Sequence, residues 1–253
     1  MKTVKEWSDA FDVLFNEVMS NASAALDEYD KSIFLTKAQE EIIKNYANPR
    51  GNKYQEGYDD SAKRQSDFAT LMANASLSVA SGYTKFDTRS TAYQFPNDFF
   101  IAINEQFQVT ADGKVYPYTI VPISYAEYNK MMKKPYKYPA KSQVWRLITG
   151  EQTVLGNTVP VVEIIGIFNP AGAGVYKLRY VKRPKPIILV DLTTVDNNLS
   201  INGLTAATTC ELPEHIHEEI LQRAVELAKA AYATDQNGTI QLNNQVQVGQ
   251  RSE

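Results

Sequence analysis

The strongest constraint in this sequence is the position of its helical patterns, which lie at the two ends of the chain and leave a β-type pattern between them. Both helical patterns show apolar residues at spacings of three and four, as expected for helices with one buried face. The N-terminal pattern consists of Trp7, Phe11, Leu14, Phe15 and Val18. The C-terminal pattern follows the start signal Leu212-Pro213-Glu214 and consists of Ile216, Ile220, Leu221, Ala224, Leu227, Ala228 and Ala231.

Two residue pairs predict helix starts in the N-terminal third. Thr3 with Glu6, and Thr36 with Gln39, have the spacing of a capping box, in which each side chain binds a free backbone N–H of the other residue. A further helix is expected from about residue 59 or 60 to about residue 74. The first third is therefore predicted to be helical.

The middle of the chain, from about Leu77 to Val190, has β-branched and aromatic residues in short runs separated by Gly and Pro. Asp112-Gly113 is a strong hairpin signal, and Pro117 indicates an edge or a bulge because it lacks an N–H. Ser124 with Glu127 predicts the capped start of one short helix, which is expected to reach residue 134. The predicted strands cover 99–103, 106–109, 115–121, 144–148, 159–168 and 176–181.

This layout predicts an α+β protein in which N- and C-terminal helices form a helical bundle and an antiparallel β module is inserted between them. The bundle is expected to comprise 1–76 and 204–235, and the β-rich module 77–203. Residues 236–253 are rich in Asn, Gln and Gly. Because they cannot bury a core of their own, they are expected to form an extended arm that orders on a neighbour.

Composition excludes several classes of protein. The formal net charge of −3 and the pI of about 5.6 disfavour a general nucleic-acid binder, which has a basic face. The single cysteine, Cys210, rules out an internal disulfide. No apolar run approaches the roughly 20 residues of a membrane span, and the N-terminus lacks the apolar core of a signal peptide. We therefore expect a cytosolic product without a membrane partner.

No pattern in the sequence predicts catalysis, a cofactor or a metal. His215 and His217 lie two residues apart on an expected helix, so their rings point in different directions and do not share an ion easily. Cys210 matches no thiol-enzyme signature and is expected to be a buried small residue. The loop 171–174 (Ala-Gly-Ala-Gly) precedes a strand rather than a helix, so it is interpreted as a turn and not as a phosphate site.

One basic segment stands out, YVKRPKP at 180–186. Pro184 and Pro186 keep it extended, so Lys182, Arg183 and Lys185 are displayed at the exit of the β module. It fits a contact with an acidic neighbour or a phosphate backbone, and equally a solvated strand exit.

Three stretches resemble the head–tail ring, or connector, proteins of crAss-like bacteriophages. They are LDEYDKSIFLTKAQEEIIKN (26–45), KLRYVKRPKPIIL (177–189) and CELPEHIHEEILQRAVELAKAAY (210–232). The resemblance implies a fold similar to the tail adaptors of short-tailed phages, a helical bundle with a β insertion. It further implies a homo-oligomeric ring in the virion, usually of twelve copies, which docks to the portal protein and to further tail or ring proteins. Genomic DNA passes through such a ring without specific binding.

Under this hypothesis the partner contacts fall on the basic segment and on the arm. The expected contact residues are Lys182, Arg183, Lys185, Gln241, Leu242, Val246 and Val248. The alternative is a tail component that binds a ligand or glycan through the β module, with Trp145, Tyr136 and Tyr138 as candidate stacking residues. An enzyme is the third and least supported hypothesis, because no acid/base arrangement has a recognisable spacing.

Overall fold

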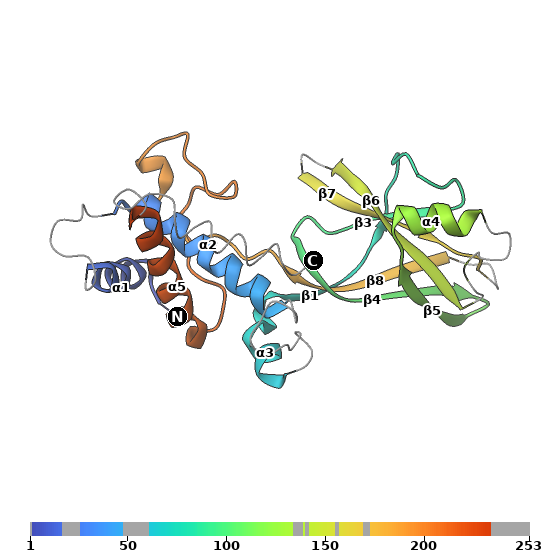
Figure 1. The fold of residues 1–253 in the computed structure, drawn as a ribbon, viewed down its shortest axis with the longest axis horizontal. Helices are drawn as coiled ribbons and strands as arrows, with labels where there is room; N and C mark the ends of the chain where they lie inside the picture. The colour runs from blue at the N-terminus through green and yellow to red at the C-terminus, as the bar shows by residue number, and fades with distance from the viewer. Residues whose placement is uncertain are drawn as a thin grey trace. The chain divides into compact units, whose positions relative to one another are not determined.

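The computed structural model describes residues 2–16, 26–47, 61–133, 139, 142–154, 157–168 and 173–233. They form two compact units (Figure 1), which we call the helical unit and the β unit. The helical unit joins Met1–Thr70 with Pro184–Glu253, and the β unit is Leu71–Arg183. The β unit is thus inserted within the helical unit, with bounds at 71 and 183 where the sequence analysis placed them at 77 and 203. The expected arm, 236–253, lies outside the described residues.

The helical unit is built on α5, against which both α1 and α2 pack. The predicted apolar face of α5 is buried at Ile216, Ile220 and Ala224. The capping box at the start of α1 is confirmed, since Thr3 N donates to Glu6 Oε2 over 2.6 Å and Glu6 N donates to Thr3 Oγ1 over 3.3 Å. The helices of this unit are α1 (Val4–Asn16), α2 (Glu28–Ala47), α3 (Ala62–Asp67), α5 (Glu214–Ala233) and the short 3-10 turn η3 (Leu192–Thr194).

The predicted helix start at Thr36 and Gln39 is wrong. Both residues lie inside α2, which begins at Glu28, where the Asp27 carboxylate accepts from Glu28 N over 2.7 Å. The predicted helix ending near residue 74 is also wrong in part, because residues 72–76 form a strand. In each case the local pattern was outweighed by a partner distant in sequence, which local spacing does not reveal.

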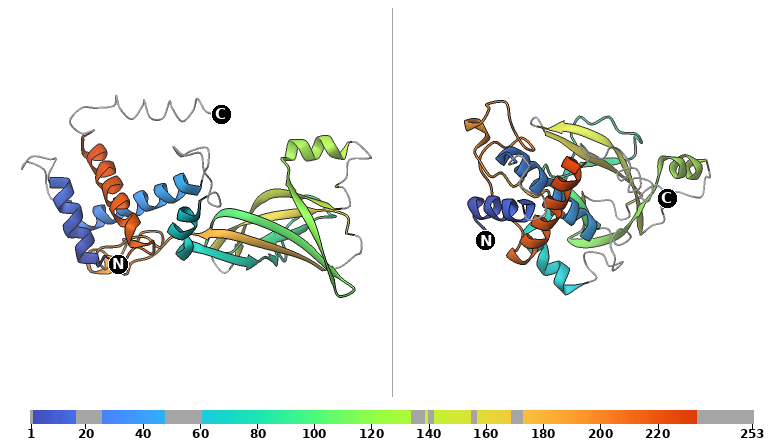
Figure 2. Two further views of the ribbon diagram at one scale, coloured as in Figure 1. Left: turned by 90° about the horizontal axis from the view of Figure 1, so that it is seen from below. Right: turned by 60° about the vertical axis from the view of Figure 1, so that its left-hand side comes forward.

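The β unit contains one eight-stranded sheet of order β1-β8-β4-β5-β6-β7-β3-β2. The sheet is strongly twisted in both views of Figure 2, and the 3-10 turn η2 (Ala69–Leu71) precedes it. Its strands are β1 (Met72–Ser76), β2 (Ser78–Val79), β3 (Thr91–Gln94), β4 (Phe99–Ala111), β5 (Lys114–Pro122), β6 (Gln143–Val154), β7 (Asn157–Ile165) and β8 (Ala173–Lys182).

The hairpin predicted at Asp112-Gly113 is confirmed. Both residues have positive φ, 51° and 72°, as a two-residue type I′ turn requires. β4 pairs with β5 on either side of this turn. Pro117 pairs with Gln108 of β4, while the pairing of β5 with β6 begins only at Thr119. Pro117 therefore lies where its strand has a neighbour on one side only, as its missing N–H predicts.

The prediction of an antiparallel module is wrong for one pair of strands. β5 and β6 run parallel, with Thr119 opposite Gln143 and Pro122 opposite Arg146. Parallel strands need a crossover connection, which is usually a helix. The helix α4 (Tyr125–Met132), whose capping box at Ser124 and Glu127 is confirmed, supplies that crossover.

The core of the β unit is aromatic. Tyr93, Phe107 and Tyr176 are nearly fully buried and contact one another through their rings. The interpretation of 171–174 as a turn is wrong for its second half, because Ala173 and Gly174 pair with β4 as part of β8. A side chain at Gly174 would lie 2.5 Å from Phe107 Cζ, so the glycine is needed for the ring to pack.

Four hydrogen bonds join α2 to the extended segment that follows Arg183, and they hold the two parts of the helical unit together. We call these contacts the polar ladder. They join Leu189 N to Ser32 Oγ (3.0 Å), Ile187 N to Thr36 Oγ1 (3.1 Å), Thr36 Oγ1 to Ile187 O (3.4 Å) and Gln39 Nε2 to Lys185 O (3.2 Å).

The spacing of the polar ladder follows from the geometry of its two elements. Ser32, Thr36 and Gln39 lie on one face of α2, at spacings of four and three. Seven helical residues rise about 10.5 Å, and four extended residues rise about 13 Å, so alternate residues of 185–189 come opposite successive turns. Ile187, whose backbone N–H takes part in the ladder, is fully buried. Side chains of α2 thus provide hydrogen-bond partners for backbone groups that have no strand partner.

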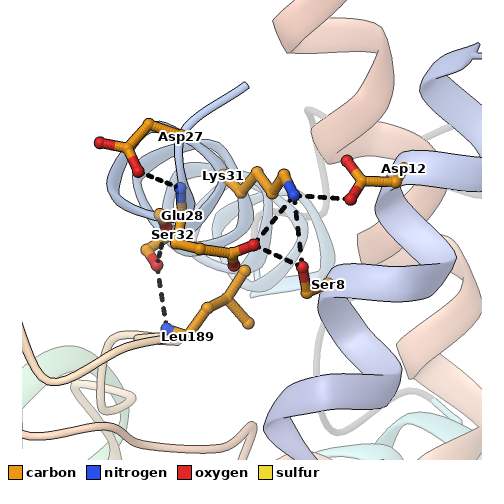
Figure 3. Close-up of polar contacts among 7 residues, drawn as sticks. All are labelled: Ser8, Asp12, Asp27, Glu28, Lys31, Ser32 and Leu189. Atoms are coloured by element: carbon orange, nitrogen blue, oxygen red, sulfur yellow. Dashed lines mark hydrogen bonds and ion pairs between the residues drawn. The ribbon is translucent and has the colours of Figure 1, made fainter. Parts of the chain in front are cut away.

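A second polar cluster joins α2 to α1 (Figure 3). Lys31 is only 3% exposed, and its Nζ lies 2.7 Å from Asp12 Oδ2 and 3.0 Å from Glu28 Oε1. Burial alone lowers the pKa of Lys31, but the bonds to the two carboxylates outweigh it and raise the pKa above its ordinary value. The lysine is therefore charged and serves packing within the unit.

Replacing Thr36 by Val keeps the shape of the side chain and removes the acceptor for Ile187 N. We expect this change to lower the free energy of unfolding by about 1–3 kcal/mol, because it leaves a buried N–H without a partner. Equilibrium urea unfolding followed by helical circular dichroism measures the loss. Thr110→Val, at an exposed position of β4, is the matched control and should change stability by less than about 0.5 kcal/mol. Equal effects of the two variants would contradict a role for the ladder.

Candidate assembly surfaces

The predicted basic segment is divided between the two units. Lys182 and Arg183 end the β unit, where Arg183 N donates to Asp98 O over 2.7 Å and the guanidinium carbon lies 5.8 Å from the Phe100 ring centroid. The Arg183 side chain is exposed and the Lys182 side chain is half-buried. A hydrogen bond thus fixes the backbone of Arg183, while its exposed guanidinium group can contact a partner.

Lys185 belongs to the helical unit and is differently placed. Its Nζ lies 2.9 Å from Glu211 Oε1, and this hydrogen bond raises the pKa of Lys185. Lys185 is exposed and Glu211 is half-buried, so the pair contributes little to stability. The expected contact residues of the arm, Gln241, Leu242, Val246 and Val248, lie outside the described residues.

The residues considered for chemistry are engaged separately. His215 Nε2 lies 2.5 Å from Asp67 Oδ1, whereas His217 Nε2 lies 2.9 Å from Leu212 O. Burial lowers the pKa of His217, so the ring is neutral and donates to that carbonyl. Burial raises the pKa of the Cys210 thiol to about 11, which keeps it protonated and poorly reactive. Within the described ranges no three His, Cys, Asp or Glu side chains gather as metal ligands do.

Trp145, the candidate for stacking on a sugar, is buried. It is 5% exposed and packs with Ile123, Tyr128, Leu147 and Ile165 between α4 and the sheet. A sugar can reach its face only if this cluster unpacks. The other two candidates, Tyr136 and Tyr138, lie outside the described residues.

A buried carboxylate in the β unit was not identified from the sequence. Glu163 of β7 is fully buried and accepts from Phe86 N (2.7 Å), Asp87 N (3.2 Å) and Ser90 Oγ (2.5 Å). Its oxygens therefore bind the segment before β3 to the sheet. An isolated Glu within an apolar run, VVEII, was the available signal, because an acid at a buried strand position needs several donors.

Asp87 extends this network toward α4. Its Oδ2 accepts from Tyr128 Oη over 2.6 Å and from Arg89 Nη2 over 3.0 Å. Burial acts to raise the pKa of Asp87, but the bonds from Arg89 and Tyr128 prevail and lower it to about 2. With its oxygens engaged by protein donors, Asp87 holds a loop in place.

Two open grooves lie on exposed surfaces, one in each unit. The groove in the β unit has a volume of about 340 Å³ and runs over the outer face of β1, β8 and β4, with Lys177 and Arg179 at its centre. The groove in the helical unit has a volume of about 440 Å³ and lies between α1 and α5, and its charged lining residues are Lys2, Glu6, Asp9 and Glu218. Alternation along the predicted strand 176–181 would have identified both cations as members of one exposed face.

The low pKa of Asp87 leads to a prediction about the stability of the fold in acid. Because its pKa is lower in the folded chain than its ordinary 3.8, its contribution is complete above about pH 4 and is lost as the pH falls toward 2. Asp87→Asn should therefore flatten the fall of the melting temperature over this window. Thermal melts from pH 5 to pH 2 measure it, with Asp112→Asn in the exposed hairpin turn as the control that keeps the wild-type slope. Parallel melting curves for Asp87→Asn and wild type would show that the carboxylate does not contribute.

None of the described helices is both long and apolar enough to cross a bilayer.

Comparisons with known proteins agree with the resemblance noted in the sequence. The family described as phage tail ring protein 3/4 matches residues 1–240. The chain is 48% identical over 252 residues to ring protein 4/5 of Bacteroides phage crAss001, covering 99% of each chain. It is 31% identical over 233 residues to ring protein 3 of the same phage, covering 89% of this chain and 94% of the relative. The predicted similarity to ring proteins of crAss-like phages is confirmed, and the chain belongs to the phage tail ring protein 3/4 family.

Proposed function

We propose that the chain is a structural subunit of a connector ring at the head–tail junction of the virion. In this proposal the ring contains about twelve copies in closed rotational symmetry, docks to the portal and to other ring or tail proteins, and surrounds the DNA exit channel. Membership of the tail ring family supports the ring itself. The names of the two relatives, both ring proteins of one phage, support a place among further rings.

The observation that carries the proposal is the opposite charge of the two units. The β unit has 13 Lys and Arg against 7 Asp and Glu, a formal charge of +6. The helical unit has 13 Lys and Arg against 22 Asp and Glu, a formal charge of −9. A ring of identical subunits needs two unlike surfaces that attract each other, and a chain with this division of charge carries such a pair.

The division of charge also bears on the channel. DNA binds proteins largely through cations that neutralise its phosphates. In our proposal the acidic helical unit dominates the wall of the channel, so that genomic DNA passes without specific binding. Lys182 and Arg183 then contact neighbouring virion proteins, together with Gln241, Leu242, Val246 and Val248 of the arm.

The ring is tested by imaging and mass. Negative-stain microscopy and mass photometry of the purified protein, alone and mixed with the portal protein of the same phage, should show closed rings that stack on the portal. The association should weaken with added salt, because exposed charges attract less as screening increases. A chain that stays monomeric in both conditions would contradict the proposal.

The arm is tested separately by deleting residues 236–253. We expect the truncated chain to keep its melting temperature, because these residues are too polar to form a core, and to bind the portal at least tenfold more weakly. Biolayer interferometry on immobilised portal measures the second effect. Unchanged binding by the truncated chain would assign docking to the folded units alone.

A further inference from the structure

The groove of the β unit has an ordered arrangement of polar side chains, and we call it the cation groove. Strand register places two rows across β1, β8 and β4, each with one cation in the middle and an amide or hydroxyl on either side. The rows are Asn74, Arg179, Asn104 and Ser76, Lys177, Gln106.

The two cations of this groove differ from two arginines of the β unit that have acidic partners. Arg146 lies 3.2 Å from Glu105, and Arg89 lies 3.0 Å from Asp87. Lys177 and Arg179 are exposed, and among the described residues neither has an acidic partner. The neighbouring amide and hydroxyl groups add hydrogen-bond donors beside the positive charges of Lys177 and Arg179. This arrangement is suited to binding carboxylates.

The opposite charge is found on α1 of the helical unit. Glu6, Asp9 and Val13 follow one another at spacings of three and four, so they form one stripe along the exposed side of the helix. Val13 is 58% exposed, and Glu218 of α5 lines the same groove, where its Oε2 lies 3.5 Å from Lys2 Nζ. We call Glu6, Asp9, Val13 and Glu218 the acidic ridge.

We propose that the cation groove of one copy of the chain receives the acidic ridge of a second copy. This inference rests on the proposed ring and names the contact that closes it. The spacings agree, since Lys177 and Arg179 are two strand residues apart, about 6.6 Å, and Glu6 and Asp9 are neighbours on a helix at about 5–6 Å.

The acidic ridge also contains an apolar residue on which the methylene groups of Lys177 and Arg179 can pack. The methylene groups of Lys and Arg pack on apolar surface while their charges reach polar partners, and Val13 lies in line with the two acids. The opposite formal charges of the units, +6 and −9, favour the same pairing at long range. Each copy has both surfaces, so the contact repeats around a ring.

Charge reversal and charge exchange test the contact. Lys177→Glu with Arg179→Glu should weaken ring formation at least tenfold, measured by mass photometry across a concentration series. Lys114→Glu with Lys133→Glu changes the net charge equally at exposed positions outside the groove, and should leave association within about twofold of wild type. Adding Asp9→Lys and Glu218→Lys to the groove reversal should restore rings, because two of the three ridge acids then have the opposite charge, while Glu6 is kept since it caps α1.

The remaining outcomes separate this contact from the proposed function. Rings that survive the groove reversal would overturn the contact and leave the ring intact. If the groove-reversed chain forms rings of unchanged mass but no longer binds a fluorescent DNA duplex that wild type binds, the groove binds phosphates and the proposed contact is overturned. A wild-type chain that forms no ring, alone or with the portal, would contradict the ring and with it this contact.

Discussion

The polar ladder between α2 and residues 185–189 is the interaction on which the fold depends most. The helical unit is made from two parts of the sequence separated by the whole β unit, so a strong contact must join the returning chain to the first part. Ser32 and Thr36 accept from its backbone, and Gln39 donates to it. Because the returning segment is extended and buried, the side chains of α2 provide the partners that a strand would find in a sheet.

Because the polar ladder joins the first and last parts of the chain, the β unit can have its own core and its own net charge. Its aromatic core and its buried Glu163 network are formed without residues of the helical unit. The two units can therefore differ in surface composition, and they do so to the extent of opposite net charge. A chain of this kind is an asymmetric building block, suited to repeated head-to-tail contact in a closed ring.

Much of the fold was predictable from local signals. The capping boxes at Thr3 and Ser124, the hairpin at Asp112 and the apolar face of α5 each depend on residues close together in sequence. The errors arose where a distant partner decides the structure. Thr36 and Gln39 have capping-box spacing but bind the returning chain, and residues 72–76 become a strand because β8 lies beside them. The parallel pairing of β5 and β6 is compatible with the predicted helix between them, because parallel strands need a crossover connection and this is usually a helix.

The surfaces were less predictable than the fold, for a related reason. Lys182, Arg183 and Lys185 were predicted contacts because they are close together in a basic segment, and in the structure Lys185 is paired with Glu211. Lys177 and Arg179 are separated by a buried leucine, and they form a site only when β1 and β4 add polar neighbours on both sides. Net charge was also misleading, because a total of −3 conceals a basic unit and an acidic unit.

The central claim is that copies of this chain form a ring by placing the β unit of one subunit against the helical unit of the next. An electron cryo-microscopy map of the head–tail region of the intact virion tests it most directly. The account predicts a closed ring in which β1, β8 and β4 of each subunit face α1 of its neighbour. A ring whose lateral contacts join like units, or a virion without this chain in a ring, would contradict it.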